Sequence, residues 1–358
     1  MGSNLYSIIS GTGCYVPTRI VRNSDFLGNE FYDESERRID KPNPEIIQKF
    51  EEITGIRERR YVTDDLVASD IAFLAAEDAL ESSNIDRESL DYLIVAHNFG
   101  DIRDDNRRSE LVPSLSARVK HKLRIKNPRT IAYDISFGCP TWLQGIIQAD
   151  YYIRSGDARR IMIIGAETLS RISDPHDRDS MLYSDGAGAA IIEARESERP
   201  VGVISHAARS DTFEHVYMLQ MRESYNPVNN ELFLKMRGHN LYEYALLTVP
   251  LVVKESLDKA GLGLDDIKKV LIHQANAKMD EAILKRLFRL CNAGEIPEHI
   301  MPMTISWLGN SSVATLPTLL DLLLKGKLDN HDLMPKDNIV FASVGAGMNI
   351  NSVVYRMP

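Results

Sequence analysis

Two stretches of this chain, far apart in the sequence, line up with each other residue by residue. The segment LAAEDALESSNIDRESLDYLIVAHN, 74–98, corresponds at a constant offset to LVVKESLDKAGLGLDDIKKVLIHQA, 251–275. In each segment the spacing of apolar residues predicts an amphipathic helix, a polar turn and then a buried strand. A chain that repeats such a unit is expected to fold as two similar halves.

A second pair of segments follows in the same order at nearly the same offset. ISF at 135–137 aligns with ISW at 305–307, and Gly156 aligns with Gly326, each as the glycine that ends a helix. Each helix leads to an apolar strand, RIMIIGAET in one half and NIVFASVGAG in the other. Any two strand-helix units match to some degree, but two pairs in the same order favour an internal duplication.

The alternation of strands and helices predicts the fold class. Several strands are apolar throughout, which indicates α/β layers around buried sheets. The last segment, NIVFASVGAGMNINSVVYRM, has two extended runs around Gly345-Ala346-Gly347 and predicts a hairpin, so the sheets should be mixed. We divide the chain into halves at 1–200 and 201–358, and interpret the charged stretch 99–113 as a surface loop.

Length, charge and cysteine usage exclude several classes of protein. The 358 residues, 44% of them hydrophobic, are ample for a large core. A net charge of -9 opposes loose association with nucleic acid or an anionic membrane surface. The start MGSNLYSIISG lacks the features of a signal peptide, and no apolar run reaches the ~18 residues of a membrane span. Three dispersed cysteines predict neither a disulfide framework nor a metal site, but an intracellular protein of the reducing cytoplasm.

One of the cysteines stands at a strand-helix junction. RTIAYDISFG predicts a strand, Pro140 suits the first helical position because it lacks an N–H, and Gly156 ends the helix. This makes Cys139 the expected N-cap, beside unpaired backbone N–H groups and the positive end of the helix dipole. Such a position lowers the pKa of a thiol from ~8.5 and favours the thiolate, which is the nucleophilic form. Cys14 and Cys291 lack that setting and are interpreted as inert core residues.

Two polar residues of the second half complete a candidate site. VLIHQAN ends its apolar strand at His273, where the first half has Ala96, and LGNSSVATLP places Asn310 next to the position that mirrors Cys139. If the halves pack about a pseudo-twofold axis, strand ends from both meet at one pocket. Taken singly, a histidine at a strand end and an asparagine after glycine are commonly structural, but with Cys139 they predict an active site.

Several ordered motifs resemble the ketoacyl-ACP synthase III branch of the thiolase-fold condensing enzymes, over nearly the whole length of the chain. SGTGCYVP and TGIRERRYV are similar to the family's amino-terminal motifs, and SDPHDRDSMLYSDGAGAAIIEA to its central glycine-rich segment. LIHQANAKM and LGNSSVATLP are similar to the blocks that carry its histidine and asparagine. The resemblance implies a duplicated, five-layered α-β-α-β-α fold and an acyltransferase. It also implies thioester substrates, on acyl carrier protein or coenzyme A, and no bound cofactor.

The resemblance also implies a role for each candidate residue. Cys139 would accept the acyl group, and the backbone amides of Cys139 and Ala346 would bind the developing oxyanion. His273 and Asn310 would stabilise the enolate that forms when a malonyl thioester loses CO2. Further matches to substrate-binding positions of the family are Arg57, Arg178, Asn276 and Val112.

A basic helix face predicts where a carrier protein docks. After HQAN, Lys278, Lys285 and Arg289 have helical spacing, with Arg286 adjacent, and Lys278, Lys285 and Arg286 match basic docking positions of the family. Isolated basic faces are usually only solvated, but this one belongs to an acidic protein and stands beside the proposed active-site mouth, which suits an acidic carrier protein. The resemblance further implies a homodimer in which the segment around Val112 completes the partner's pocket.

Departures from the family pattern leave the substrate open. Lys49 stands near the place of a usual adenine-stacking tryptophan, although Arg178 matches the opposing arginine, so we expect weak binding of coenzyme A and an acyl donor on carrier protein. Val112 replaces a common phenylalanine, which indicates a longer or bulkier acyl chain. The loop 99–113, PTW after Cys139 and the ending GAGMNINS are also similar to ketosynthase/cyclases that form dialkylresorcinol and cyclohexanedione rings.

Three functions follow from these features. The first is a decarboxylating condensation of the synthase III type. The second keeps the nucleophile but joins a β-ketoacyl thioester to an acyl or enoyl thioester and closes a ring. The third is a non-catalytic partner subunit of a condensing enzyme, against which the intact set of Cys139, His273 and Asn310 argues.

Overall fold

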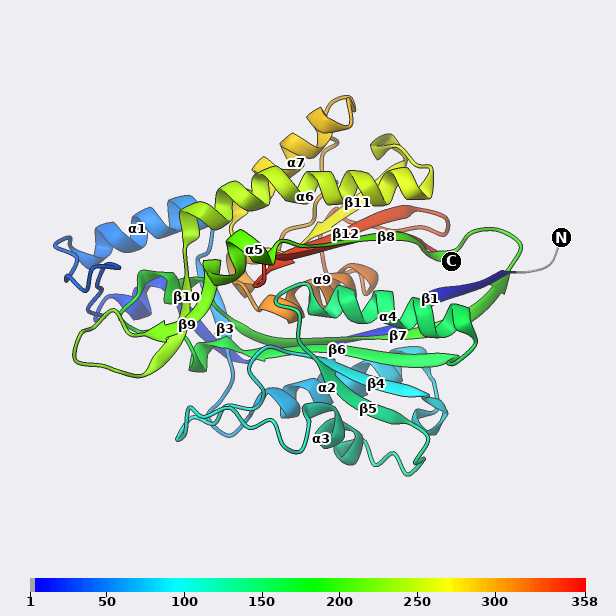
Figure 1. Cartoon of the computed structure of the whole chain (residues 1–358), viewed down its shortest axis with the longest axis horizontal. Coiled ribbons are helices and arrows are strands. Elements are labelled where there is room, and N and C mark those ends of the chain that lie inside the picture. The colour runs from blue at the N-terminus through cyan, green and yellow to red at the C-terminus, as the bar shows by residue number, and fades with distance from the viewer. Residues whose placement is uncertain (1–3) are drawn as a thin grey trace.

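The computed structural model describes residues 4–358, and each half of the chain contributes one large mixed sheet (Figure 1). The first sheet contains, in spatial order, β1 (Asn4–Tyr15), β7 (Asp185–Ser197), β6 (Arg160–Thr168), β4 (Tyr92–Ala96) and β5 (Ile131–Ile135). Strand β7 pairs antiparallel with β1 and β6, whereas β4 pairs parallel with β6 and β5.

The second sheet repeats this arrangement. It contains, in spatial order, β8 (Gly202–Ser210), β13 (Asn349–Arg356), β12 (Asn338–Gly345) and β11 (Ile267–Ile272). Strand β13 pairs antiparallel with β8 and β12, and β11 pairs parallel with β12. The order and the directions match those of β1, β7, β6 and β4, which agrees with an internal duplication. The antiparallel pairing of β12 with β13 confirms the predicted hairpin and the mixed sheets.

Helices lie between the two sheets and on both outer faces (Figure 1). The central layer holds α4 (Thr141–Ser155) and α9 (Thr315–Leu324), the first sheet is covered by α2 (Ala68–Ser83) and α3 (Leu115–Lys122), and the second by α6 (Gly238–Ala260) and α7 (Ala277–Leu290). Three buried apolar clusters fill the spaces between these layers. The predicted α-β-α-β-α order of layers is confirmed.

The smaller elements gather mainly at one end of the layers, on the left of Figure 1. They are β2 (Arg19–Arg22), α1 (Asn43–Thr54), β3 (Glu58–Tyr61), α5 (Thr212–His215), β9 (Leu219–Glu223), β10 (Leu232–Met236) and α8 (Ile305–Leu308). A fourth apolar cluster packs Ile46 and Phe50 of α1 against Leu169 and Leu182. This end of the molecule surrounds the candidate site.

The two halves differ where the sequence predicted a match between 135–137 and 305–307. The first segment includes the end of strand β5, but the second lies in the short helix α8. The side chain of Gln274 explains the difference, because its Oε1 accepts the backbone N–H groups of Thr304 and Ile305 at 2.8 and 2.9 Å. Those groups are therefore not available to a sheet, and the predicted structural match at this point is wrong.

The predicted boundary at residue 200 lies between β7 and β8, in the connection from one sheet to the other. Both halves contribute to the cluster around α4 and α9, so they share one core. The division into 1–200 and 201–358 stays an interpretation of the repeat. The stretch 99–113 is largely exposed, as expected of a surface loop. None of the helices within residues 4–358 has both the length and the apolar character needed to cross a membrane.

Candidate active site

A cavity of about 1180 Å³ is lined by residues from both halves of the chain. Cys139 reaches it from the turn before α4, His273 from the end of β11, and Asn310 from the segment between α8 and α9. Ala346, in the turn between β12 and β13, also lines it. The structure thus brings Cys139, His273 and Asn310 to one cavity, as expected if the two halves pack against each other.

Glycines allow the backbones of the two halves to touch beside Cys139. Gly138 has a φ of 70°, and a Cβ on it would lie 2.7 Å from the backbone nitrogen of Ala346. A Cβ on Gly345 would lie 2.9 Å from the Cβ of Cys139. The side chain of Asn349 holds the turn in place by donating to the carbonyl of Ala346 at 2.8 Å. Larger residues at either glycine would force the Cys139 and Ala346 segments apart.

Helix α4 begins later than predicted. Its N-cap is Pro140, and Cys139 precedes that residue. The N–H of Gln144 donates to the carbonyl of Pro140 at 3.0 Å as the first bond of the helix, while the N–H of Thr141 donates to Gly138 in the entering turn. Cys139 therefore lies in this turn and is not the helix cap.

The predicted lowering of the Cys139 pKa is also wrong for the free protein. Burial raises the pKa of this thiol to about 11, because desolvation disfavours the thiolate more than its hydrogen bonds favour it. The hydroxyl of Ser312 donates to Sγ at 3.2 Å and acts in the opposite direction, whereas the charge of Glu167 raises the pKa further. Ser312 thus favours the thiolate. Sequence reasoning missed it, although it stands in the same LGNSS block as Asn310.

His273 is buried and neutral. Its backbone N–H donates to the carbonyl of Ala342 at 2.8 Å, which continues the pairing of β11 with β12. Burial lowers the pKa of the imidazole to about 4, because the charged form loses its hydration. Within residues 4–358 its Nδ1 has no hydrogen-bond partner. A neutral imidazole can donate one hydrogen bond without transferring its proton outright.

Hydrogen bonds to both the backbone and the side chain of Asn310 hold this residue in place. Its N–H donates to the carbonyl of Leu182 at 2.9 Å, and its carbonyl accepts from Ser184 at 2.8 Å. Its Oδ1 accepts the N–H of Ser312 at 2.8 Å. This bond fixes which end of the amide is the oxygen, and the NH2 group is left free to act as a donor.

A buried carboxyl group stands behind the nucleophile. Glu167, at the end of β6, accepts the backbone and the side-chain N–H of Asn98 at 2.9 and 2.7 Å. The Asn98 amide also lies 3.4 Å from the hydroxyl of Ser312. Burial raises the pKa of Glu167 to about 7. Sequence reasoning missed this group too, yet an acidic residue inside the apolar run RIMIIGAET was a usable signal.

The cavity wall includes two more polar residues that the sequence did not single out. The carboxyl of Asp179 has its pKa raised to about 7 by burial and by the neighbouring charge of Asp177. Tyr183 also lines the cavity, and its buried hydroxyl has no hydrogen-bond partner in the described part of the chain. Nothing in the sequence around either residue indicates an orientation toward the cavity.

The expected substrate-binding residues do not all reach this cavity. Arg178 and Asn276 line it, and Asn276 also caps α7 by accepting the N–H of Met279 at 3.2 Å. The side chain of Arg57 is exposed and outside the lining. Val112, in the loop before α3, is 89% exposed and also outside the lining. Lys49 lies on the rim and forms an ion pair with Glu52 at 3.6 Å.

The predicted basic face is present on a helix. Lys278, Lys285 and Arg286 are exposed on α7, which begins next to the cavity-lining Asn276. Lys285 forms an i,i+4 ion pair with Glu281 at 3.7 Å, and both side chains are well exposed. The exposed positive charges therefore lie on the helix whose first turn borders the cavity.

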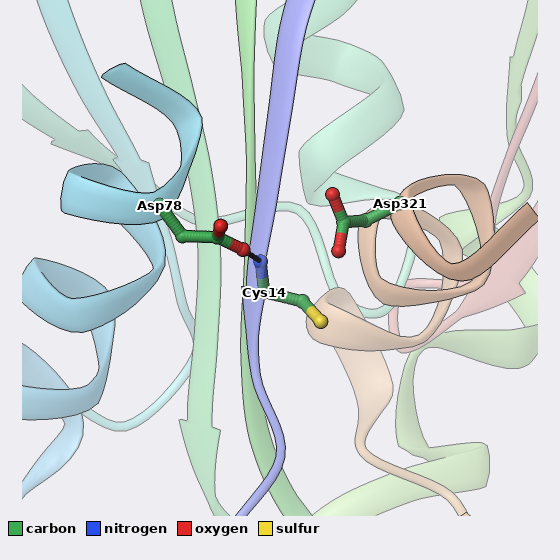
Figure 2. A group of neighbouring side chains, drawn as sticks. All are labelled: Cys14, Asp78 and Asp321. Atoms are coloured by element: carbon green, nitrogen blue, oxygen red, sulfur yellow. Dashed lines mark hydrogen bonds between the residues drawn. The ribbon is translucent and has the colours of Figure 1, made fainter. Parts of the chain in front are cut away.

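Cys14 belongs to a separate cluster of titratable groups. Figure 2 shows it on β1 between Asp78 of α2 and Asp321 of α9, and the ligand atoms of all three lie within 4.8 Å of one another. The Lys325 ammonium pairs with Asp78 at 2.6 Å and with Asp321 at 2.8 Å, so a cation of the protein already lies between the two carboxylates. Burial, followed by the charge of Asp321, raises the pKa of the Cys14 thiol. These contacts join three elements and fit the expected inert role.

Comparisons with known proteins agree with this fold. The family model described as 3-oxoacyl-[acyl-carrier-protein (ACP)] synthase III matches residues 133–212, and that of its C-terminal part matches 257–357. A β-ketoacyl-[acyl-carrier-protein] synthase III from Xanthomonas campestris pv. campestris is 29% identical over 368 aligned positions, covering 99% of this chain and 100% of the relative.

Solved structures give the same result. The β-ketoacyl-[acyl carrier protein] synthase III of Thermus thermophilus superimposes with a TM-score of 0.81 at 28% identity, over 98% of this chain and 99% of its own. The 3-oxoacyl-[acyl-carrier-protein] synthase III of Aquifex aeolicus gives a TM-score of 0.76 at 26% identity, over 98% and 99%.

The duplicated fold with a cavity between its halves is that of a thiolase-superfamily condensing enzyme, a class of acyltransferases. Within that class, the chain belongs to the enzymes that resemble 3-oxoacyl-[acyl-carrier-protein] synthase III.

Proposed function

We propose that this enzyme forms a carbon–carbon bond by Claisen condensation of an acyl group held on Cys139 with a carrier-bound thioester. The observation that supports this most strongly is that Cys139, His273 and Asn310, from both halves of the chain, line one cavity. A non-catalytic subunit would not need all three of these side chains in one cavity.

In the first step, the Cys139 thiolate attacks the carbonyl carbon of an acyl thioester. The developing oxyanion accepts hydrogen bonds from the backbone amides of Cys139 and Ala346, whose segments are in contact. The carrier thiolate leaves and takes up the proton that the Cys139 thiol has lost. Ser312 favours this step because its hydroxyl stabilises negative charge on Sγ.

In the second step, a malonyl thioester loses CO2 and leaves an enolate. His273 Nε2–H and the Asn310 amide donate to the enolate oxygen, and the low pKa of His273 keeps the imidazole neutral. The enolate carbon then attacks the acyl carbonyl and expels the Cys139 thiolate. The product is a β-ketoacyl thioester, and these steps need no cofactor beyond the thioester carriers.

The partners follow from two exposed surfaces. The positive side chains of Lys278, Lys285 and Arg286 suit an acidic acyl carrier protein that delivers substrate to the adjacent cavity. The exposed Val112 side chain suits a homodimer, in which it would be buried against the partner. Arg178 lines the cavity, and its positive charge suits an anionic part of the thioester carrier.

Ring closure is the second candidate, and the size of the cavity favours it. Pockets for drug-sized ligands occupy roughly 300–1000 Å³, whereas this one measures about 1180 Å³. Such a volume accommodates two acyl chains, as a β-ketoacyl thioester and an acyl or enoyl thioester would require.

Incubation with each donor pair separates the two reactions. Acyl plus malonyl thioester should give a linear β-ketoacyl product, and β-ketoacyl plus enoyl thioester a ring, as detected by mass spectrometry. Cys139→Ala is the control and should abolish both products. If neither pair yields a carbon–carbon bond with the wild type, the proposed function is wrong.

A further inference from the structure

A chain of hydrogen bonds leads from a buried carboxyl group to the sulfur of Cys139. Asn98 donates both its backbone N–H and its side-chain amide to Glu167 Oε1, at 2.9 and 2.7 Å. The same amide nitrogen donates to the Ser312 hydroxyl at 3.4 Å, and that hydroxyl donates to Sγ of Cys139 at 3.2 Å. The proposed reaction uses only the last of these contacts, so Asn98 has no role in it yet.

The register of two strands brings Asn98 and Glu167 together. Strands β4 and β6 are parallel neighbours in which Ala96 pairs with Gly165. Asn98 and Glu167 each follow these paired residues by two positions, so they stand opposite each other where the strands end. Since one carboxyl oxygen accepts from both the backbone and the side chain of Asn98, the orientation of the Asn98 amide is fixed.

The second half of the chain holds Ser312 against these strand ends. A Cβ on Gly165 would clash with the carbonyl oxygen of Val313, so the backbone next to Ser312 touches β6. Ser312 itself has a φ of 51°, a left-handed conformation that is uncommon for serine. Its N–H donates to Asn310 Oδ1 at 2.8 Å, which helps to keep this conformation. With the backbone of Ser312 held in this way, the direction of its hydroxyl hydrogen depends on the groups around the oxygen.

The chemistry of the amide sets the direction of each bond. Glu167 Oε1 already accepts a backbone N–H, so the side-chain atom of Asn98 that faces it must be the nitrogen. An amide nitrogen donates but does not accept, and the Ser312 oxygen is therefore the acceptor of the contact with Asn98. A hydroxyl has one hydrogen, and this leaves it for Sγ.

We propose that Asn98 is a positioning residue for Cys139: its amide, fixed by Glu167, donates to the Ser312 hydroxyl and keeps the hydrogen of that hydroxyl directed at Sγ. Without Asn98, the hydroxyl is free to rotate, and its bond to the sulfur weakens. This inference deepens the proposed function, in which Cys139 is the nucleophile, but it concerns the free protein and needs no thioester.

The rate of alkylation of Cys139 by iodoacetamide tests the inference, with the mass of the peptide that contains Cys139 as the readout. Asn98 acts through one further group, so Asn98→Ala should slow alkylation only modestly, roughly 2- to 4-fold. Asn98→Leu retains about the same volume without a donor and should give the same decrease, which keeps the test valid if the smaller side chain impairs folding.

A double-mutant cycle with Ser312→Ala distinguishes positioning from a general structural role. Once the Ser312 hydroxyl is absent, Asn98 has nothing to direct at the sulfur. Asn98→Ala should therefore slow alkylation in the wild-type background but have no further effect in the Ser312→Ala background.

Asn23→Ala is the matched control. Asn23 is also buried and also donates its side-chain amide to a glutamate, Glu51, at 3.0 Å, but it lies outside the cavity lining. This substitution removes a similar bond and should leave the alkylation of Cys139 unchanged.

The outcomes separate the inference from the proposed function. An unchanged rate in Asn98→Ala and Asn98→Leu overturns the inference. So does a decrease that persists in full in the Ser312→Ala background, or an equal decrease in Asn23→Ala. Failure of the wild type to form a carbon–carbon bond with any pair of thioesters overturns the proposed function alone, because alkylation is measured without substrate.

Discussion

Replacing Ser312 by alanine should slow every reaction of the Cys139 thiolate. The Ser312 hydroxyl donates to Sγ at 3.2 Å and lowers the pKa of a thiol that burial otherwise raises to about 11. A hydrogen bond to a charged acceptor contributes about 1.5–3 kcal/mol, which is a factor of roughly 10 to 150 in the thiolate fraction at neutral pH.

The expected change in rate is smaller than the change in thiolate fraction. A thiolate of higher pKa is intrinsically more nucleophilic, with a Brønsted coefficient of about 0.4–0.5, and this offsets about half of the loss on a logarithmic scale. The net decrease should be roughly 3- to 15-fold. It should be constant across neutral pH, where both proteins remain far below their thiol pKa.

Alkylation by iodoacetamide, followed as the mass increase of the intact protein, measures this effect without any substrate. Ser311→Ala is the control, because the Ser311 hydroxyl is buried nearby but lies 3.4 Å from the Thr315 hydroxyl instead of contacting Sγ. An unchanged rate in Ser312→Ala, or an equal decrease in Ser311→Ala, would refute this reasoning about the thiol.

The other predictions concern the carrier, the dimer and the decarboxylation step. Reversing the charge at Lys278 and Lys285 should lower the rate with carrier-bound donors roughly tenfold and flatten its salt dependence, because exposed charges act over about 10 Å at 0.1 M salt. The rate of the double variant with small thioesters should equal that of the wild type. If its rates with carrier-bound and small donors fall equally, the basic face has a structural role and does not dock the carrier. If the proposed homodimer forms, Val112→Glu should shift it toward the monomer in light scattering. A wild-type protein that is monomeric and fully active would contradict the proposed role of Val112. His273→Ala should slow decarboxylation about 100-fold or more while Cys139 still acylates. Since the His273 pKa is about 4, the NMR signal of its imidazole should not shift between about pH 5 and pH 8, and a titration of that imidazole in this range would contradict the neutral role.

The layered fold could be predicted because its signals are local and repeated. Helix periodicity followed by apolar strands appears in both halves, and the glycines that end α4 and α9 adopt left-handed φ values of 82° at Gly156 and 64° at Gly326. The glycine turn at Gly345–Gly347 indicated the final hairpin. The place where the repeat breaks was hidden, because it depends on the side chain of Gln274 reaching a segment 30 residues further along the chain.

The candidate site could be predicted only in part. Strand ends and the family motifs indicated Cys139, His273 and Asn310, since these residues stand at recognisable junctions. The thiol pKa was predicted in the wrong direction, because the sequence shows a helix start but not how deeply the sulfur is buried beside Glu167. The contact with Ser312 joins residues far apart in the chain, and no local pattern indicates it.

The most direct test of the central claim is the mass of the intact protein after exposure to an acyl thioester, followed by addition of the second thioester. The account predicts one acyl group on the peptide that contains Cys139, no such group in Cys139→Ala, and loss of the group when the second thioester is added and a carbon–carbon bond forms. An acyl group that persists in Cys139→Ala, or an adduct on Cys139 that no second thioester consumes, would contradict the account.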